Sequence, residues 1–389
     1  MKYIVLLGDG MPDWPIAKIG GKTPLEKART PNMDFLASEG RLGLVQVIPD
    51  GLPPGSDVGH LSVLGYNPRK YYTGRAPIEA ASMGIKLGPR DIAFRCNLVT
   101  IARKDGVPIM KDFSAGHISS KESHPLIRRI QSKLGGKGIE FYPGVGYRHL
   151  MIWRNGPTRT KLTPPHDISD RPIETHLPRS EGADFLMGLI LKSQGLLKGN
   201  GTDANSIWLW GQGRATRLPM FPLKGGLISA VDIVRGVGRL AGLEIIKVPG
   251  ATGYFDTNYE NKADYALKVL KKRDFVFVHL EATDEAGHMG DLKKKLMAIE
   301  DFDRRLIGRL LRGLKKRAAT EGCPYKILLT SDHATPLKLK THTPDPVVFA
   351  IYDSRMNLPP RRRGFNEKDA KRAGDLVKVG HHLIKQFLK

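Results

Sequence analysis

Three separated stretches of the chain carry side chains that can bind divalent metal ions and transfer a phosphoryl group. The residues are Asp9 between two glycines, Ser56 after a Pro-Pro-Gly sequence, and a C-terminal group of Asp284, His288, Asp332, His333 and His342. Their carboxylate and imidazole groups suffice to hold two divalent ions, with the serine hydroxyl at the centre. Such a two-ion site suits phosphoryl transfer, because it can bind both the attacking and the leaving oxygen.

The spacing within these stretches bears on how the side chains could share an ion. Asp284 and His288 are four residues apart and would share one face of a helical turn. Asp332 and His333 are neighbours, so from a kinked loop they could serve one ion or reach toward two. His342 follows in a loop that contains prolines. Each residue has an ordinary alternative in a turn, a helix start or the surface, and only the combination is specific.

Ser56 is the candidate nucleophile. It stands in a Gly- and Pro-rich loop before an apparent helix start, where a serine most often serves only as an N-cap. A free hydroxyl is a weak nucleophile, and no general base precedes it in the motif, so we expect metal coordination to activate it. The helix N-terminus behind it would offer amide donors to a phosphate.

Strand-like runs alternate with helical patterns, which indicates an α/β fold with a mostly parallel sheet and helices on both faces. The expected strands are Tyr3–Leu7, Leu42–Ile48, Ile207–Trp210, Glu244–Val248, Phe275–Leu280, Ile327–Thr330 and Val347–Tyr352. The expected helices include Met33–Glu39, Ala230–Ala241, Asn261–Lys271, Leu292–Arg312 and Lys368–Phe387. Several candidate ligands follow expected strands, where open α/β sheets place their ligand sites.

The stretch 86–205 differs from the rest, because it is rich in glycine and proline and carries none of the seven residues. We interpret it as a smaller α+β domain that binds substrate. It would be inserted into a metal-binding, phosphatase-like catalytic domain formed by residues 1–85 and 206–389.

The net charge of +23 is the unusual bulk property. Basic runs at 271–273, 293–295, 315–317 and 361–363 lack a helix-turn-helix, zinc-finger or aromatic RNA-binding signature. A solvated basic surface is the preferred interpretation, followed by steering of a phosphorylated anion and then by a nucleic-acid partner. Two cysteines fit a reducing, cytoplasmic compartment, and no apolar run approaches the length of a membrane span.

The motifs resemble those of the archaeal-type cofactor-independent (2,3-bisphosphoglycerate-independent) phosphoglycerate mutases, in the alkaline phosphatase superfamily. The resemblance runs over nearly the whole chain and is carried by GSDVGHLSVLGY (55–66), YYTGR (71–75), VPGATGYFDTNY (248–259) and TSDH (330–333). It implies an alkaline-phosphatase-like fold, a phosphoserine intermediate on Ser56 and two divalent ions, manganese or else zinc, cobalt or magnesium. One ion would be held by Asp284, His288 and His342, and the other by Asp9, Ser56, Asp332 and His333.

Four basic residues are the candidates for substrate contacts: Arg75, Arg148, Arg214 and Lys224. Arg75 matches a motif of the family, Arg148 lies in the expected insertion, and a guanidinium suits bidentate binding of phosphate or carboxylate. Each could equally be a surface residue in so basic a chain. His117 departs from the family pattern, which has an arginine at that place.

The resemblance therefore implies a mutase that interconverts 2-phosphoglycerate and 3-phosphoglycerate, with the inserted domain excluding water from the phosphoserine. Two alternatives stay open. One is a related metal-dependent phosphatase, phosphomutase or phosphotransferase that acts on another small phosphoester. The other is a nucleic-acid-binding protein with an idle metal site, against which the complete set of seven residues argues.

Overall fold

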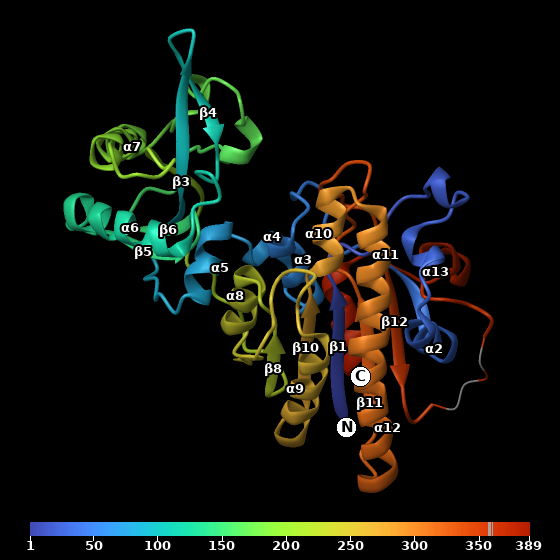
Figure 1. The fold of residues 1–389 in the computed structure, drawn as a ribbon. Coiled ribbons are helices and arrows are strands. Elements are labelled where there is room, and N and C mark those ends of the chain that lie inside the picture. The colour runs from blue at the N-terminus through green and yellow to red at the C-terminus, as the bar shows by residue number, and fades with distance from the viewer. Residues whose placement is uncertain (357–358, 360) are drawn as a thin grey trace. The chain divides into compact units, whose positions relative to one another are not determined.

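The computed structural model describes residues 1–356, 359 and 361–389, and within them the chain forms two compact units. The core unit consists of Met1–Tyr72 and Leu218–Lys389, and the inserted unit of Thr73–Arg217 (Figure 1). The insertion expected at 86–205 lies inside the inserted unit, which extends further at both ends. It does so because α5 (Arg75–Ser82) packs on β3 (Ile92–Lys104), and β7 (Ser206–Arg214) pairs with β3.

The core unit is built on an eight-stranded sheet in the order β13-β2-β12-β11-β1-β10-β8-β9. Only β12 runs antiparallel to its neighbours, so the predicted α/β class with a mostly parallel sheet is confirmed. The strands are β1 (Lys2–Gly8), β2 (Arg41–Val45), β8 (Gly225–Ile228), β9 (Glu244–Ile245), β10 (Phe275–Leu280), β11 (Tyr325–Thr330), β12 (Val347–Asp353) and β13 (Leu376–Val377).

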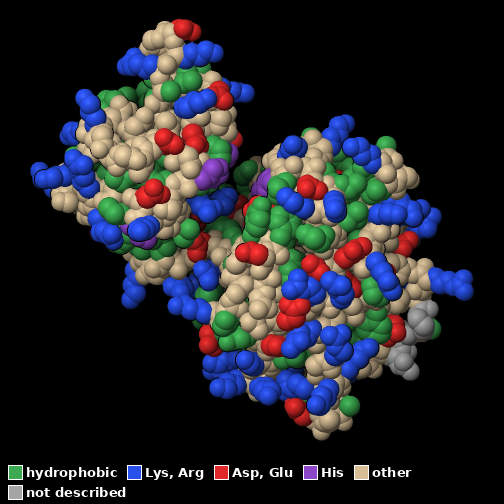
Figure 2. Space-filling view, in the orientation of Figure 1, with side chains coloured by type: hydrophobic (Ala, Val, Ile, Leu, Met, Phe, Trp, Pro, Cys, Tyr) green, Lys and Arg blue, Asp and Glu red, His purple; other side chains and the backbone are tan. Residues whose placement is uncertain are grey.

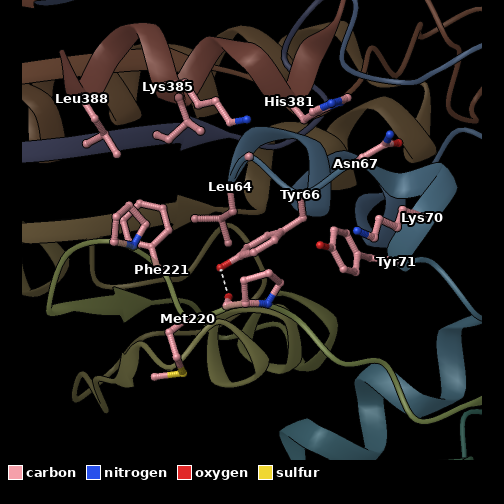
Figure 3. A pocket seen from close by; sticks show the side chains of 14 residues that line it. Leu64, Tyr66, Asn67, Lys70, Tyr71, Met220, Phe221, His381, Lys385 and Leu388 are labelled. Carbon is pink, nitrogen blue, oxygen red and sulfur yellow. Dashed lines mark hydrogen bonds between the residues drawn. The ribbon is translucent and has the colours of Figure 1, made fainter.

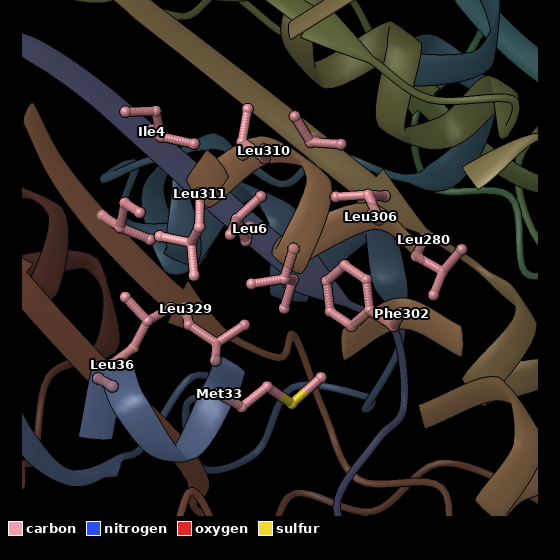
Figure 4. Close-up of a cluster of buried hydrophobic side chains, with 14 of the residues drawn as sticks. Ile4, Leu6, Met33, Leu36, Leu280, Phe302, Leu306, Leu310, Leu311 and Leu329 are labelled. Carbon is pink, nitrogen blue, oxygen red and sulfur yellow. The ribbon is translucent and has the colours of Figure 1, made fainter. Parts of the chain in front are cut away.

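Helices cover both faces of this sheet, because successive residues of a strand point to opposite sides. Leu6 of β1 packs in a buried apolar cluster with Leu36 of α2 and Leu310 of α12 (Figure 4). On the other face, Gly238 of α8 lies against Leu227 of β8. The helices of the core unit are α1 (Pro24–Lys27), α2 (Pro31–Glu39), α3 (Ser56–Val63), α4 (Pro68–Tyr71), α8 (Asp232–Leu240), α9 (Tyr259–Lys272), α10 (Ala282–Met289), α11 (Leu292–Asp301), α12 (Gly308–Glu321), α13 (Glu367–Ala373) and α14 (Leu383–Leu388). A π-helical segment, Phe302–Ile307, joins α11 to α12.

Two sequence predictions for the core unit are wrong in detail. The single helix expected over 368–387 is divided, because Gly374 adopts a left-handed conformation (φ 73°) that ends α13 before β13 joins the sheet edge. The basic run 293–295 is not wholly a surface feature, since Lys293 is exposed whereas Lys295 is fully buried. Two positions along a helix turn the side chain by about 200°, which brings Lys295 to the inner face of α11.

The inserted unit contains a five-stranded antiparallel sheet and two long helices. Its strands run in the order β4-β3-β6-β5, and β7 pairs with β3 on the side opposite β6. The remaining elements are β4 (Val107–Asp112), β5 (Ile139–Val145), β6 (Arg148–Trp153), α6 (Ser120–Leu134) and α7 (Ala183–Leu197). Ile127 of α6 and Ile190 of α7 pack with Phe94 of β3 in one buried cluster, which gives the unit a core of its own and the predicted α+β character.

Among the described residues, no helix combines the length and the apolar character that a membrane span requires.

Candidate metal centre

Three adjacent parallel strands of the core sheet, β11, β1 and β10, end at one edge, and the acidic candidates follow them. Asp9 comes directly after β1, and Asp332 follows β11 with one residue, Ser331, between them. β10 leads through Glu281 into α10, which carries Asp284. The backbone N–H of Asp9 donates to the carbonyl of Leu280 over 2.9 Å, which ties the first of these loops to β10. The sheet thus delivers carboxylates from distant parts of the chain to one place.

Asp9, Asp332 and His333 form a buried cluster whose possible ligand atoms all lie within 4.8 Å of one another. His333 Nε2 lies 3.1 Å from Asp332 Oδ2 and 3.4 Å from Asp9 Oδ1, and all three side chains are fully buried. Asp9 Oδ1 and Asp332 Oδ2 have no hydrogen-bond partner among the described residues. Buried carboxylate oxygens without a donor are costly, and a cation would satisfy them.

The electrostatics of this cluster also fit a cation. Burial, together with the nearby charges of Asp332, Glu281 and Asp284, raises the pKa of Asp9 well above its usual range. Burial lowers the pKa of His333 to about 4, so its imidazole is neutral at pH 7, as a metal ligand must be. A divalent ion would offset the crowded negative charge, and carboxylate plus neutral imidazole is a donor set for manganese or zinc.

Ser56 faces the buried cluster. It is the first residue of α3, and the N-cap position belongs to Gly55, so the N-cap interpretation of this serine is wrong. Its Oγ instead lies 3.3 Å from Nε2 of His333. Gly59, one turn along α3, allows the close approach, because a Cβ there would lie 2.8 Å from the Cβ of Asp332.

Asp284, His288 and His342 form a second cluster, also within 4.8 Å. His288 Nε2 lies 3.0 Å from Asp284 Oδ2 and 3.0 Å from Nε2 of His342. His288 Nδ1 lies 3.0 Å from the carbonyl of Lys340, which can only accept, so the neutral ring carries its proton on Nδ1 and keeps the Nε2 lone pair for an ion. Burial opposes ionisation of Asp284, but hydrogen bonds from the two histidines outweigh it and hold its pKa well below the usual range.

The two clusters are neighbours, linked by Thr335. Its hydroxyl donates to Asp284 Oδ1 and lies 3.3 Å from Nδ1 of His333. Because the hydroxyl has one proton and gives it to Asp284, His333 must donate from Nδ1, which leaves its Nε2 free as well. The rings of His333 and His342 lie 4.0 Å apart between centroids. The structure therefore brings together all seven residues that the sequence placed in one site.

The sequence interpretation gave no role to several buried residues around this site. His60 Nδ1 lies 2.8 Å from the carbonyl of Ser56, and His279 Nε2 lies 2.8 Å from Asp9 Oδ2. Burial, and then the charge of Asp284, raises the pKa of Glu281 to about 8. The sequence did contain a signal for His279, since it stands in the otherwise apolar strand 275–280. A buried imidazole among aliphatic residues needs a polar partner, which indicates a place in a site.

The four predicted substrate residues are not all near this site. Lys224 immediately precedes β8, at the amino ends of the parallel strands, whereas the clusters lie beyond the carboxyl ends. Arg75, Arg148 and Arg214 belong to the inserted unit, where Arg148 and Arg214 are exposed. Arg75 Nε lies 3.1 Å from Glu79, which also pairs with the buried Arg95 over 3.0 Å. Arg95 was not predicted from the sequence.

A pocket of about 370 Å³ lies elsewhere in the core unit and contains none of the candidate ligands (Figure 3). Leu64, Tyr71 and Phe221 line it, and the Tyr66 hydroxyl donates to the carbonyl of Pro219 over 2.8 Å. Its lining combines these apolar side chains with Lys70, His381 and Lys385, and it contains no carboxylate.

Comparison with known proteins agrees with this chemistry. Residues 37–202 match a family model described as 2,3-bisphosphoglycerate-independent phosphoglycerate mutase. A probable enzyme of that name from Geobacter sulfurreducens is 52% identical over 402 aligned positions, covering 100% of both chains. A relative of the same name from Methanosarcina barkeri is 50% identical, covering 97% of both.

Two solved structures resemble this chain over its whole length. A protein of Pyrococcus horikoshii aligns over 100% of this chain and 96% of its own, with 30% identity and a TM-score of 0.80. A cofactor-independent phosphoglycerate mutase from Thermoplasma acidophilum aligns over 100% and 99%, with 25% identity and a TM-score of 0.66. The chain belongs to the family of 2,3-bisphosphoglycerate-independent phosphoglycerate mutases.

Proposed function

We propose that this chain interconverts 2-phosphoglycerate and 3-phosphoglycerate through a phosphoserine on Ser56, with two divalent ions bound at the two clusters. The observation that carries the proposal is the position of Ser56. Its Oγ lies at the start of a helix and 3.3 Å from His333 Nε2, beside buried carboxylate oxygens that have no hydrogen-bond partner in the described part of the chain. A serine held there has the surroundings of a nucleophile rather than of a cap.

The ligand sets follow from the two clusters. Asp284, His288 and His342 would hold one ion, and Asp9, Ser56, Asp332 and His333 the other. Manganese suits this mixture of carboxylate and imidazole donors, and zinc, cobalt and magnesium are the alternatives. Bound ions would favour the deprotonated form of Ser56 and neutralise charge that develops on the phosphoryl oxygens.

In the proposed reaction, Ser56 Oγ attacks phosphorus and the bond from phosphorus to the glycerate oxygen breaks. The released oxygen takes a proton, the glycerate turns without leaving, and its other hydroxyl then attacks the phosphoserine. Ser56 Oγ departs in this second step, so the net reaction moves one phosphoryl group and consumes no water. Substrate binding by the inserted unit, through Arg75, Arg148 and Arg214, remains part of the proposal and rests on the family resemblance.

The test is phosphorus NMR of purified protein supplied with 3-phosphoglycerate, after chelation and again after Mn²⁺ is added. Activity should disappear with chelation and return with the ion. Ser56→Ala should abolish isomerisation while the fold and most metal binding persist. Ser62→Ala, in the same helix and also buried, is the matched control and should retain activity. Isomerisation by Ser56→Ala at the wild-type rate would exclude the mechanism.

The same spectra separate the alternatives. Release of inorganic phosphate in place of 2-phosphoglycerate would identify a phosphatase.

Lys and Arg side chains are spread over the face shown in Figure 2, which supports a general basic surface. Retention on duplex DNA at physiological salt would contradict this part of the proposal. A cytoplasmic location is proposed with it, on the ground that both cysteines are free.

A further inference from the structure

One buried cation of the core unit joins the segments that carry the metal-ligand candidates. Lys295, on α11, is fully buried, and its ammonium makes hydrogen bonds to Asp13 Oδ2 (2.9 Å) and to the carbonyls of Thr335 (2.7 Å) and Pro12 (3.5 Å). An ammonium has three N–H donors, so all three are satisfied. Burial of a charge in this way is tolerated only when its partners are fixed.

The partners of Lys295 come from two different ligand-bearing segments. Asp13 and Pro12 lie in the loop that begins at Asp9. Thr335 begins the loop that ends at His342, and its hydroxyl contacts both Asp284 and His333. Lys295 itself stands on α11, which packs against α10, the helix of Asp284 and His288 (Figure 1).

Asp13 extends the same connection. Its Oδ2 also accepts the N–H of Leu337 over 3.0 Å, and its Oδ1 accepts the N–H of Trp14 over 2.7 Å. The N–H of Thr335 donates to the carbonyl of Pro12 over 3.3 Å. The two loops are therefore joined twice, by this backbone hydrogen bond and by the ammonium group of Lys295 that both loops contact.

We propose that Lys295 and Asp13 are positioning residues that hold the three ligand-bearing segments in register, and so set the affinity of the metal centre. Neither side chain is a candidate ligand, and neither belongs to the seven residues of the site. The inference rests on the metal centre of the proposed function and does not depend on the substrate.

The test compares Mn²⁺ binding in four forms of the full chain. Lys295→Met should weaken binding about tenfold to a hundredfold, the range found when an outer partner of a metal site is removed. Lys293→Met, the same change at an exposed position of α11, is the control and should bind as the wild type does. Lys295→Arg keeps the charge and donors, and should retain more affinity than Lys295→Met.

A double variant distinguishes positioning from simple stability. Lys295→Met leaves Asp13 buried without its partner, whereas Lys295→Met with Asp13→Asn removes both charges and should recover the melting temperature. Under the proposal it does not recover Mn²⁺ affinity, and the electron paramagnetic resonance spectrum of the bound Mn²⁺ stays altered. Recovery of both properties, or wild-type affinity in Lys295→Met, would overturn the inference. If the wild type binds Mn²⁺ but fails to isomerise phosphoglycerate, only the proposed reaction fails.

Discussion

The two candidate ligand clusters differ in how the fold holds them. The side chains of Asp9, Asp332 and His333 are fully buried and follow the central strands β1 and β11. In the other cluster, the side chains of His288 and His342 are 37% and 20% exposed. His342 comes from a loop closed by a single backbone bridge between Ala334 and Thr343.

This difference separates two ways of making a metal site. The buried cluster owes its geometry to the sheet, and it stores unfavourable charge in the absence of a cation because no water reaches its carboxylates. The more exposed cluster depends on local hydrogen bonds: His288 donates to the carbonyl of Lys340, and the hydroxyl of Thr335 donates to Asp284. We expect the buried cluster to govern the stability of the metal-free protein. We expect the more exposed cluster to govern how the affinity for Mn²⁺ responds to pH.

The largest expected effect comes from removing charge in the buried cluster. Asp332→Asn should lower isomerase activity to below about one hundredth of the wild type, since it would remove a proposed ligand rather than an outer partner. The same change should raise the melting temperature of metal-free protein at pH 7, because Asp332 is one of the charges that raise the pKa of Asp9. A carboxyl group whose pKa is higher in the folded than in the unfolded state destabilises the folded state at every pH above its unfolded-state pKa.

Calorimetry of chelated protein measures the change in melting temperature, and an isomerase assay measures the loss of activity. A metal assay counts the bound ions. His342→Ala is the comparison from the exposed cluster, and it should lose one ion without stabilising the metal-free protein. A lower melting temperature for metal-free Asp332→Asn would show that the buried carboxylates do not repel one another in the folded protein.

Gly10 offers a way to disturb the second cluster from the backbone. It has φ 57°, and a Cβ there would lie 2.4 Å from both Asp284 Oδ1 and Thr335 Oγ1. Gly10→Ala should therefore lower activity about tenfold to a hundredfold by displacing Asp284. Gly20→Ala is matched for backbone strain, with φ 73° and open space around the position. Backbone strain should cost both variants about 1 kcal/mol of stability, and only Gly10→Ala should bind Mn²⁺ more weakly in a titration.

The smallest expected effect is a pH dependence of the exposed cluster. Burial disfavours the charged form of His288, but the hydrogen bond and charge of Asp284 prevail and raise its pKa to about 9. An ion must displace that proton, so apparent Mn²⁺ affinity at this cluster should rise about tenfold from pH 7 to pH 8. In metal-free protein the raised pKa contributes stability below pH 6.5 that is lost as the pH rises toward 9.

Titration of Mn²⁺ in buffers of different ionisation enthalpy measures the released proton directly. His288→Gln removes the titrating group and should flatten the profile. A Mn²⁺ affinity that stays constant between pH 7 and pH 8 in the wild type would contradict the assignment of His288.

The sequence predicted the fold class and the seven clustered residues, since strand patterns place acidic side chains at one sheet edge and the motifs occur in family order. It did not predict Lys295 as buried, because a run of three lysines reads as surface unless the face of the helix is known. Lys224 was misplaced because its distance from the site depends on the direction of β8. His60 and His279 were missed because their carboxylate partners, Asp332 and Asp9, are identified by tertiary contacts.

The position of β1 has a consequence for synthesis of the chain. β1 is the N-terminal strand, yet both of its neighbours lie far along the sequence, with Tyr3 paired to Phe275 and Lys326. While the ribosome is still extending the chain, β1 therefore has no native partner, whereas every strand of the inserted unit finds its partners within 73–217. We expect the inserted unit to fold first, and the edge with the candidate ligands to assemble only after β10 and β11 have been synthesised.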